Sequence, residues 1–184
     1  FGIVDGGGSH FSDATGTFSG TPIAEYFEDG KQLSELPDDF YSSTDYTNKM
    51  IGYIDENQDN GKPFFAYLAY TASHWPLHAP YECIDKYNGV YVVGWNEIRK
   101  SRFERQKDLG ILPENSELPP MNRVVKNWED ISIHQKKIEL KRIELHAAMI
   151  ELMDFYIGQM IEYVEKNFDR ETIIIFVSDN GAEG

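Results

Sequence analysis

The stretch that decides the fold, residues 172–181, reads T-I-I-I-F-V-S-D-N-G. Its apolar part consists mostly of β-branched residues, and such a run is typical of a strand that is buried on both faces of a parallel sheet. In sheets of this kind, ligands bind beyond the carboxyl ends of the strands. We therefore expect Asp179 and Asn180 to stand where a metal ion or a substrate is held.

A second apolar run, residues 64–70, reads F-F-A-Y-L-A-Y and predicts another strand buried on both faces. It too ends in polar residues, because the loop at residues 71–80 reads T-A-S-H-W-P-L-H-A-P. Two strands that point the same way in one parallel sheet bring His74 to the same edge as Asp179 and Asn180. These residues lie far apart in the chain, so only the fold can join them.

Helical patterns flank both runs. Residues 42–57 begin with hydroxyl side chains and an early acid, which favour hydroxyl caps at the start of a helix. Short helices are expected at residues 81–87 and 96–109, inside a region, residues 81–131, that is expected to be a surface excursion. The alternation of helix and strand indicates an α/β fold with a mostly parallel sheet flanked by helices, in one domain that covers residues 1–184.

The strongest periodic pattern is a helix at residues 132–167. Its apolar residues form two adjacent stripes, a wide apolar face that suits a helix laid across a sheet. The stripes are Leu145, Met149, Leu152, Tyr156, Met160 and Tyr163, and Ile150, Met153, Ile157, Ile161 and Val164. The N-terminal half is rich in Lys and Glu and is expected to be more exposed.

Shorter signals lie nearer the start of the chain. The Asp-Gly pair within residues 26–33 separates two short apolar stretches and predicts a β-hairpin. The carboxylate pair that follows Pro37 precedes a helix, so it is interpreted as a turn and not as a catalytic pair. His10 follows a glycine-rich stretch, and we favour a loop histidine in solvent over a residue that lines a pocket.

The composition sets limits on the function. The chain has 184 residues, is 41% hydrophobic and 26% charged, and carries a formal net charge of −14. An acidic chain of this kind argues against nucleic acid or an anionic membrane as a partner, and no apolar run reaches the ~18 residues of a membrane span. One cysteine excludes an internal disulfide framework. The compartment stays open, with a periplasmic or secreted location favoured over a cytoplasmic one.

The residues alone allow several interpretations of the two strand ends. The oxygen atoms of Asp179 and Asn180 are hard donors, which suit Ca²⁺ or Mg²⁺ and not zinc. Two ligands are too few for either ion, which takes about six or more. Asp-Asn-Gly after a strand is also a common turn, and a histidine beside a tryptophan is often structural.

Three ordered motifs resemble the arylsulfatase family. Residues 67–80 resemble the stretch that usually reads A-P-H-W/F-P-L-x-A-P, residues 177–184 resemble the S-D-N-G metal motif, and residues 147–158 resemble the helix between them. The glycine-rich segment at residues 7–11 and the hairpin are similar to less diagnostic parts. Ser73 replaces the usual proline before His74, which loosens the backbone of that loop.

The resemblance implies an alkaline-phosphatase-like domain that hydrolyses a sulfate ester of a small molecule or a carbohydrate. Asp179 and Asn180 would bind a divalent cation, Ca²⁺ in preference to Mg²⁺. His74 would be both catalytic and substrate-binding, because it would hydrogen-bond the sulfate or the leaving-group oxygen. His78 occupies a position where the family varies, and it is interpreted as a pocket-wall or structural residue.

Other parts of the family pattern have no match in this sequence. The family's nucleophile is a formylglycine made within C/S-x-P/A-S-R, and Cys83 is followed by I-D-K-Y, so it is interpreted as a partly buried structural thiol. The paired aspartates, the upstream Lys and His and the downstream Lys are absent too. Residues 1–184 are therefore expected to be an internal part of one catalytic domain, inactive alone. The alternatives are a phosphate or phosphonate ester hydrolase of the same superfamily and a non-catalytic binding protein that lost the nucleophile.

Overall fold

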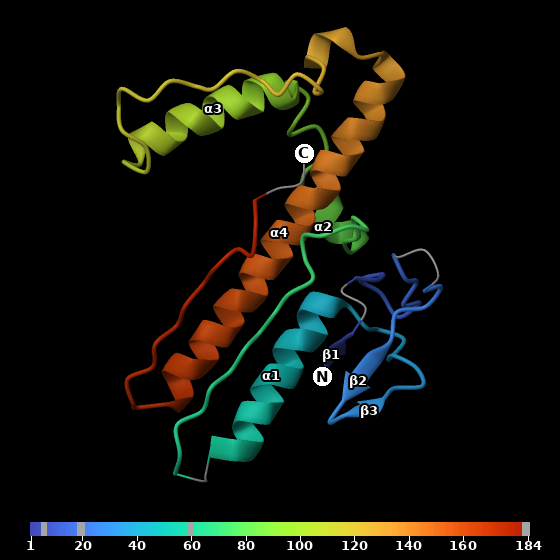
Figure 1. The fold of residues 1–184 in the computed structure, drawn as a ribbon, viewed down its shortest axis with the longest axis vertical. Coiled ribbons are helices and arrows are strands. Elements are labelled where there is room, and N and C mark those ends of the chain that lie inside the picture. The colour runs from blue at the N-terminus through green and yellow to red at the C-terminus, as the bar shows by residue number, and fades with distance from the viewer. Residues whose placement is uncertain (5–6, 18–20, 59–60, 182–184) are drawn as a thin grey trace.

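A computed structural model describes residues 1–4, 7–17, 21–58 and 61–181. The elements follow the order β1 (Gly2–Ile3), β2 (Tyr26–Glu28), β3 (Lys31–Gln32), α1 (Ser42–Asn57), α2 (Tyr81–Asp85), α3 (Gly94–Asp108), the 3-10 helix η2 (Trp128–Asp130) and α4 (Ile133–Asn167). Figure 1 shows α4 running beside α1, the small sheet on the other side of α1, and α3 projecting from the far end of α4. All four predicted helices are confirmed.

The predicted hairpin is also confirmed. Strand β2 pairs with β3 and with β1, both antiparallel, in a sheet of order β1-β2-β3. Its two-residue turn places Asp29 at φ 50° and Gly30 at φ 75°, the left-handed backbone that an Asp-Gly pair accepts readily. Behind this sheet, Tyr26 and Phe40 are buried in a core with Tyr46 of α1. The hairpin therefore closes one side of α1.

Helix α1 begins differently from the sequence prediction. Oδ2 of Asp45 accepts a hydrogen bond from the backbone N–H of Tyr41 at 2.9 Å, which confirms the role of the early acid. The predicted hydroxyl caps are wrong, because no side-chain cap bond forms and both Ser42 and Ser43 are buried. The reason is that the hydroxyl of Ser42 bonds to His10 instead of to the helix backbone.

Helix α4 is the scaffold of the chain. It starts with a capping box in which the backbone N–H of Gln135 bonds to the hydroxyl of Ser132 at 3.2 Å. It packs along α1, where Thr44 donates a hydrogen bond to the hydroxyl of Tyr156 at 2.7 Å. Its first turns are mostly exposed, but three of its four buried residues, Glu144, Ala148 and Met149, also lie in its N-terminal half, so the predicted greater exposure of that half is not confirmed. Its middle is buried under the loop at residues 71–80 and α2.

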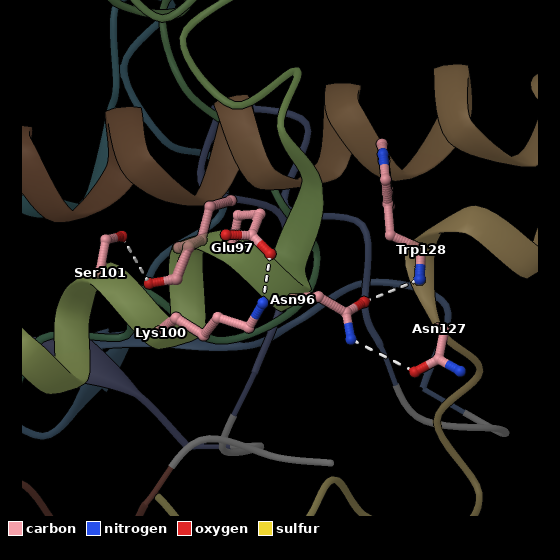
Figure 2. A network of polar contacts seen from close by, with 7 residues as sticks. Asn96, Glu97, Lys100, Ser101, Asn127 and Trp128 are labelled. Atoms are coloured by element: carbon pink, nitrogen blue, oxygen red, sulfur yellow. Dashed lines mark hydrogen bonds and ion pairs between the residues drawn. The ribbon is translucent and has the colours of Figure 1, made fainter.

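Helix α3 and the segment that returns from it are held together by hydrogen bonds of Asn96 (Figure 2) and by the ring contact between Trp95 and Trp128. The side chain of Asn96 accepts a bond from the backbone N–H of Trp128 at 2.8 Å and donates to Asn127 at 3.3 Å. The rings of Trp95 and Trp128 meet edge to face at 4.8 Å. Gly94 has a φ of 76° and lies directly under the ring of Trp128, so this position requires glycine.

The two apolar runs that were predicted as buried strands are not strands of a sheet. Residues 64–70 and 172–177 are extended, but among the described residues the sheet contains only β1, β2 and β3 and is antiparallel, so a parallel sheet is not formed. Residues 172–177 are exposed throughout, with Ile173 at 87%, whereas in the first run Phe65 is 94% exposed but Leu68 and Tyr70 are half-buried against the core that contains Tyr46. A strand forms only where a neighbour supplies backbone partners, which sequence periodicity does not provide.

These two extended segments nevertheless begin side by side. The guanidinium of Arg170 donates a hydrogen bond to the backbone oxygen of Lys62 at 3.0 Å, and the rings of Phe64 and Phe168 lie 5.2 Å apart. From this point both segments run in the same direction, from the lower ends of α1 and α4 toward α2 (Figure 1).

The helices of the described residues do not include one that is both long and apolar enough to cross a membrane.

Replacing Gly94 with alanine is expected to destabilise the protein more than the same change at Gly110. Both glycines have a positive φ, at 76° and 69°, so both variants bear the strain of a left-handed alanine, about 1–2 kcal/mol. Only at Gly94 does the new Cβ meet an obstacle, 2.1 Å from the ring of Trp128, which adds about 1–3 kcal/mol of overpacking. Urea unfolding followed by tryptophan fluorescence measures both, and equal losses contradict the packing assigned to Trp128.

Candidate active site

The loop at residues 71–80 places His74 at the surface. The backbone N–H of His74 donates to the oxygen of Thr71 at 3.0 Å, which closes a turn, and the side chain of His74 is exposed. Nδ1 of His74 lies 2.8 Å from the backbone oxygen of Trp75. Because a carbonyl oxygen only accepts, Nδ1 carries the proton of this bond. Nε2 is therefore the nitrogen that His74 offers to solvent or to a ligand.

This loop is fixed by apolar packing against α2 and α4. Ala79 is buried against Cys83, Ala148 and Met149, and Ala148 and Met149 have no exposed surface at all. Ala72 and Leu77 of the loop pack against the same cluster. The helix segment that resembles the family's central helix thus lies directly beneath the loop that resembles its histidine motif. Close packing of this kind fixes backbone position.

A second histidine, His10, supports the loop from the other side, and the prediction that it lies in solvent is wrong. His10 is 1% exposed and does not lie in solvent. Its Nδ1 is 2.7 Å from the hydroxyl of Ser42, and its Nε2 is 3.3 Å from the backbone oxygen of His74. Burial lowers the pKa of His10 below its ordinary value. Neither the adjacent Ser9 nor Ser42, the first residue of α1, stands at a sequence spacing that indicates the contacts of His10. The sequence pattern therefore could not have revealed that His10 is buried.

His78 lies in the same region and bonds to the glycine-rich segment. Its Nδ1 is 3.3 Å from the hydroxyl of Ser9, whose proton is donated to Oδ1 of Asp13 in a short hydrogen bond. Burial acts to raise the pKa of Asp13, but hydrogen bonds from Ser9 and Thr15 outweigh it, so the pKa is lowered. A half-buried His78 in this position suits the predicted wall or structural role.

The predicted metal ligands lie at the end of the second extended segment. Asp179 and Asn180 are both exposed. Oδ1 of Asp179 accepts a bond from the backbone N–H of Asn180 at 2.8 Å, and Nδ2 of Asn180 donates to the oxygen of Gly181 at 2.8 Å. Each side chain therefore keeps one oxygen, Oδ2 of Asp179 and Oδ1 of Asn180, without a protein partner in the described part of the chain.

The structure does not bring the predicted residues into contact. Among the described residues, no hydrogen bond or ion pair joins His74 to Asp179 or Asn180. Nor do the described residues hold a cluster of three or more His, Cys, Asp or Glu side chains that is suited to a metal ion. Cys83 is buried in the apolar cluster with Ala79, Ala148 and Met149, and burial raises its pKa, which suits the predicted structural thiol.

The described residues offer two separate reactive groups, the imidazole of His74 and the side-chain oxygens of Asp179 and Asn180. Nε2 of the exposed His74 ring has no hydrogen-bond partner among the described residues, and when the ring is protonated Nε2–H can bind an anionic oxygen or donate a proton to it. Two neighbouring hard oxygen donors can contribute to a Ca²⁺ or Mg²⁺ site but cannot complete one.

Comparison with known proteins shows which family this chain resembles. An arylsulfatase of Klebsiella aerogenes is 39% identical over 184 residues, which cover 99% of this chain and 39% of that relative. An uncharacterized sulfatase of Schizosaccharomyces pombe is 38% identical over 192 residues, which cover the whole chain and 34% of that relative. The chain thus spans little more than a third of the length of these relatives.

The match to the family itself extends over nearly all of the chain. A sequence profile of the sulfatases aligns with residues 6–184, which include the loop of His74, the buried middle of α4 and the Asp179–Asn180 pair. Membership implies an alkaline-phosphatase-like α/β fold, of which the described helices and small sheet form a part. The chain belongs to the sulfatase family.

Proposed function

We propose that the protein to which this chain belongs hydrolyses sulfate esters of small molecules or carbohydrates to an alcohol or phenol and inorganic sulfate. The observation that carries the proposal is the exposed His74, which presents Nε2 on a loop packed firmly against α4. The name of the arylsulfatase relative from Klebsiella aerogenes supports the same reaction class.

His74 has the geometry that proton donation to a leaving group needs. Its Nδ1–H is engaged by the backbone oxygen of Trp75, which fixes the plane of the ring and the identity of the free nitrogen. When the imidazole is protonated, Nε2–H faces outward and can hydrogen-bond a sulfate oxygen or the departing ester oxygen. General acid catalysis of this kind contributes about 10²- to 10⁴-fold to a rate.

Asp179 and Asn180 are proposed as two ligands of a divalent cation, Ca²⁺ in preference to Mg²⁺. The donor atoms fit, because Oδ2 of Asp179 and Oδ1 of Asn180 have no protein partner among the described residues and are hard oxygens. Such a cation neutralises sulfate charge and polarises the ester. The remaining ligands, of about six in total, are proposed to come from the rest of the protein.

The nucleophile is proposed to be a formylglycine located elsewhere in the protein. Cys83 does not serve this role, because the residues that follow it, I-D-K-Y, do not match the C/S-x-P/A-S-R motif in which formylglycine is made.

We further propose that the extended segments at residues 64–70 and 172–177 are neighbouring strands of a mostly parallel sheet in the whole protein. They start in contact through Arg170 and Lys62 and run in the same direction. Their exposed apolar side chains, such as Phe65 and Ile173, are typical of strands that are covered on both faces. Pairing would bring the loop of His74 and the Asp179–Asn180 pair to one sheet edge.

Replacing His74 with alanine in the full-length protein is expected to lower kcat for an aryl sulfate by about 10²- to 10⁴-fold, because the leaving oxygen loses its proton donor. The matched control is His134→Ala, a change at an exposed histidine in the first turn of α4, which should leave kcat unchanged. Equal activity of the His74 variant and the wild type contradicts the assigned role. Turnover of phosphate or phosphonate esters in place of sulfates favours the alternative hydrolase.

Calcium is expected to leave the stability of the isolated 184-residue chain nearly unchanged. With only two ligands, the dissociation constant should exceed millimolar concentrations, and the stabilisation then stays below about 0.4 kcal/mol. In the full-length protein, by contrast, calcium should raise the melting temperature, and Asp179→Ala should abolish that rise. A large rise in the isolated chain that Asp179→Ala removes would show that the chain completes a site by itself.

A further inference from the structure

His10 joins three segments that are far apart in the sequence. Its backbone oxygen accepts a bond from the N–H of Ser42 at 3.0 Å, and its Nδ1 lies 2.7 Å from the hydroxyl of the same residue. Nδ1 also lies 3.5 Å from the hydroxyl of Thr71, and Nε2 lies 3.3 Å from the backbone oxygen of His74. We call these four residues the His10 junction.

The partners of His10 decide its tautomer. The backbone oxygen of His74 only accepts hydrogen bonds, so Nε2 of His10 must carry the proton. Nδ1 is then an acceptor, and the hydroxyl of Ser42, which can rotate, donates to it. With the opposite tautomer, two acceptors would face each other at Nε2 inside a buried region. Such an unsatisfied buried pair costs about 1–3 kcal/mol.

The environment keeps this tautomer neutral. The side chain of His10 is 1% exposed, and burial lowers its pKa. The charges of His78 and His74 act in the same direction, while the bond to His74 opposes them. A neutral ring leaves Nδ1 free to accept from Ser42.

We propose that His10 is a positioning residue that fixes the main chain at His74 and thereby aims the free Nε2 of that histidine at the substrate. The proposal rests on the proposed function of His74. His10 holds the carbonyl oxygen of His74, and the ring of His74 is itself bonded to the next carbonyl, that of Trp75. The carbonyl groups of His74 and Trp75 belong to consecutive peptide groups. A shift of the His74 carbonyl therefore moves the Trp75 carbonyl, and with it the ring of His74 that is bonded there.

The loop needs the hydrogen bond from His10 because apolar packing alone does not orient the main chain at His74. Apolar packing holds Ala72, Leu77 and Ala79, which flank His74, but the side chain of His74 is exposed and is not part of this apolar cluster. Dispersion contacts fix position without fixing the direction of a carbonyl, whereas a hydrogen bond from a buried donor does. A misplacement of about 1 Å at a reacting group can cost about 10²-fold in rate.

The test uses the full-length protein with four variants. His10→Ala removes the donor, and His10→Gln restores a side-chain N–H that can reach the same carbonyl. Ser42→Ala removes the hydroxyl that fixes the tautomer. Ser43→Ala is the matched control, because Ser43 is the next residue of α1, is equally buried and is not bonded to His10.

Two readouts are measured on each variant. The first is kcat and KM for an aryl sulfate. The second is amide hydrogen exchange of the peptide that covers residues 71–78, with peptides of α3 as the reference for general loss of structure.

The expected result is a fall in kcat of about 10- to 100-fold in His10→Ala, with KM changed less than about threefold. A smaller fall is expected in Ser42→Ala, and His10→Gln and Ser43→Ala should stay within about threefold of the wild type. Exchange at residues 71–78 should be faster in His10→Ala and Ser42→Ala only, with α3 unchanged. If His10→Ala does not fold, Ser42→Ala and His10→Gln decide the question.

The proposal is overturned if loop exchange and kcat match the wild type in both His10→Ala and Ser42→Ala. It is also overturned if His10→Gln is no better than His10→Ala, or if exchange rises equally in the loop and in α3. A wild-type protein that hydrolyses no sulfate ester contradicts the proposed function instead, and the exchange rates then decide the positioning role alone.

Discussion

The loop that carries His74 owes its position to apolar side chains on α4. Ala148 and Met149 have no exposed surface because the loop and α2 cover them. An alanine at the contact allows the backbones to approach closely, and close packing transmits the position of the helix to the loop. The helix is placed in turn by α1, through the bond from Thr44 to Tyr156. The position of the loop, though not the direction of the His74 ring, is thus set by α4.

Hydrogen bonds fix the direction of the His74 carbonyl and ring, which apolar packing does not fix. His10 bonds to the backbone oxygen of His74, and the ring of His74 bonds to that of Trp75, so both the main chain and the side chain of the loop have defined partners. Burial lowers the pKa of His10, whereas the side chain of His74 is exposed. Two histidines that are 64 residues apart in the chain therefore differ in role because they differ in environment.

Local patterns predicted the local structure well. The Asp-Gly turn at Asp29 and Gly30 and the periodic helix at residues 132–167 depend on backbone preferences and on apolar spacing, which a sequence displays directly. The burial of His10 depends on contacts with residues 32 and 64 positions away, and no local pattern records those. The runs at residues 64–70 and 172–177 were predicted correctly as extended but wrongly as strands. Their composition specifies an extended backbone, whereas a strand also needs a pairing partner, which the run itself does not supply.

The candidate site, too, was predictable from the sequence only in part. The motifs around His74, Asp179 and Asn180 were visible because their residue types suit one chemistry, but their meeting at one edge depends on strand pairing that the described residues do not make. The most direct test is an experimental structure of the full-length protein with calcium and inorganic sulfate. We expect Nε2 of His74 about 2.7–3.2 Å from a sulfate oxygen, and Asp179 and Asn180 on the cation beside the same sulfate. A cation bound elsewhere, or a sulfate out of reach of His74, would contradict this arrangement.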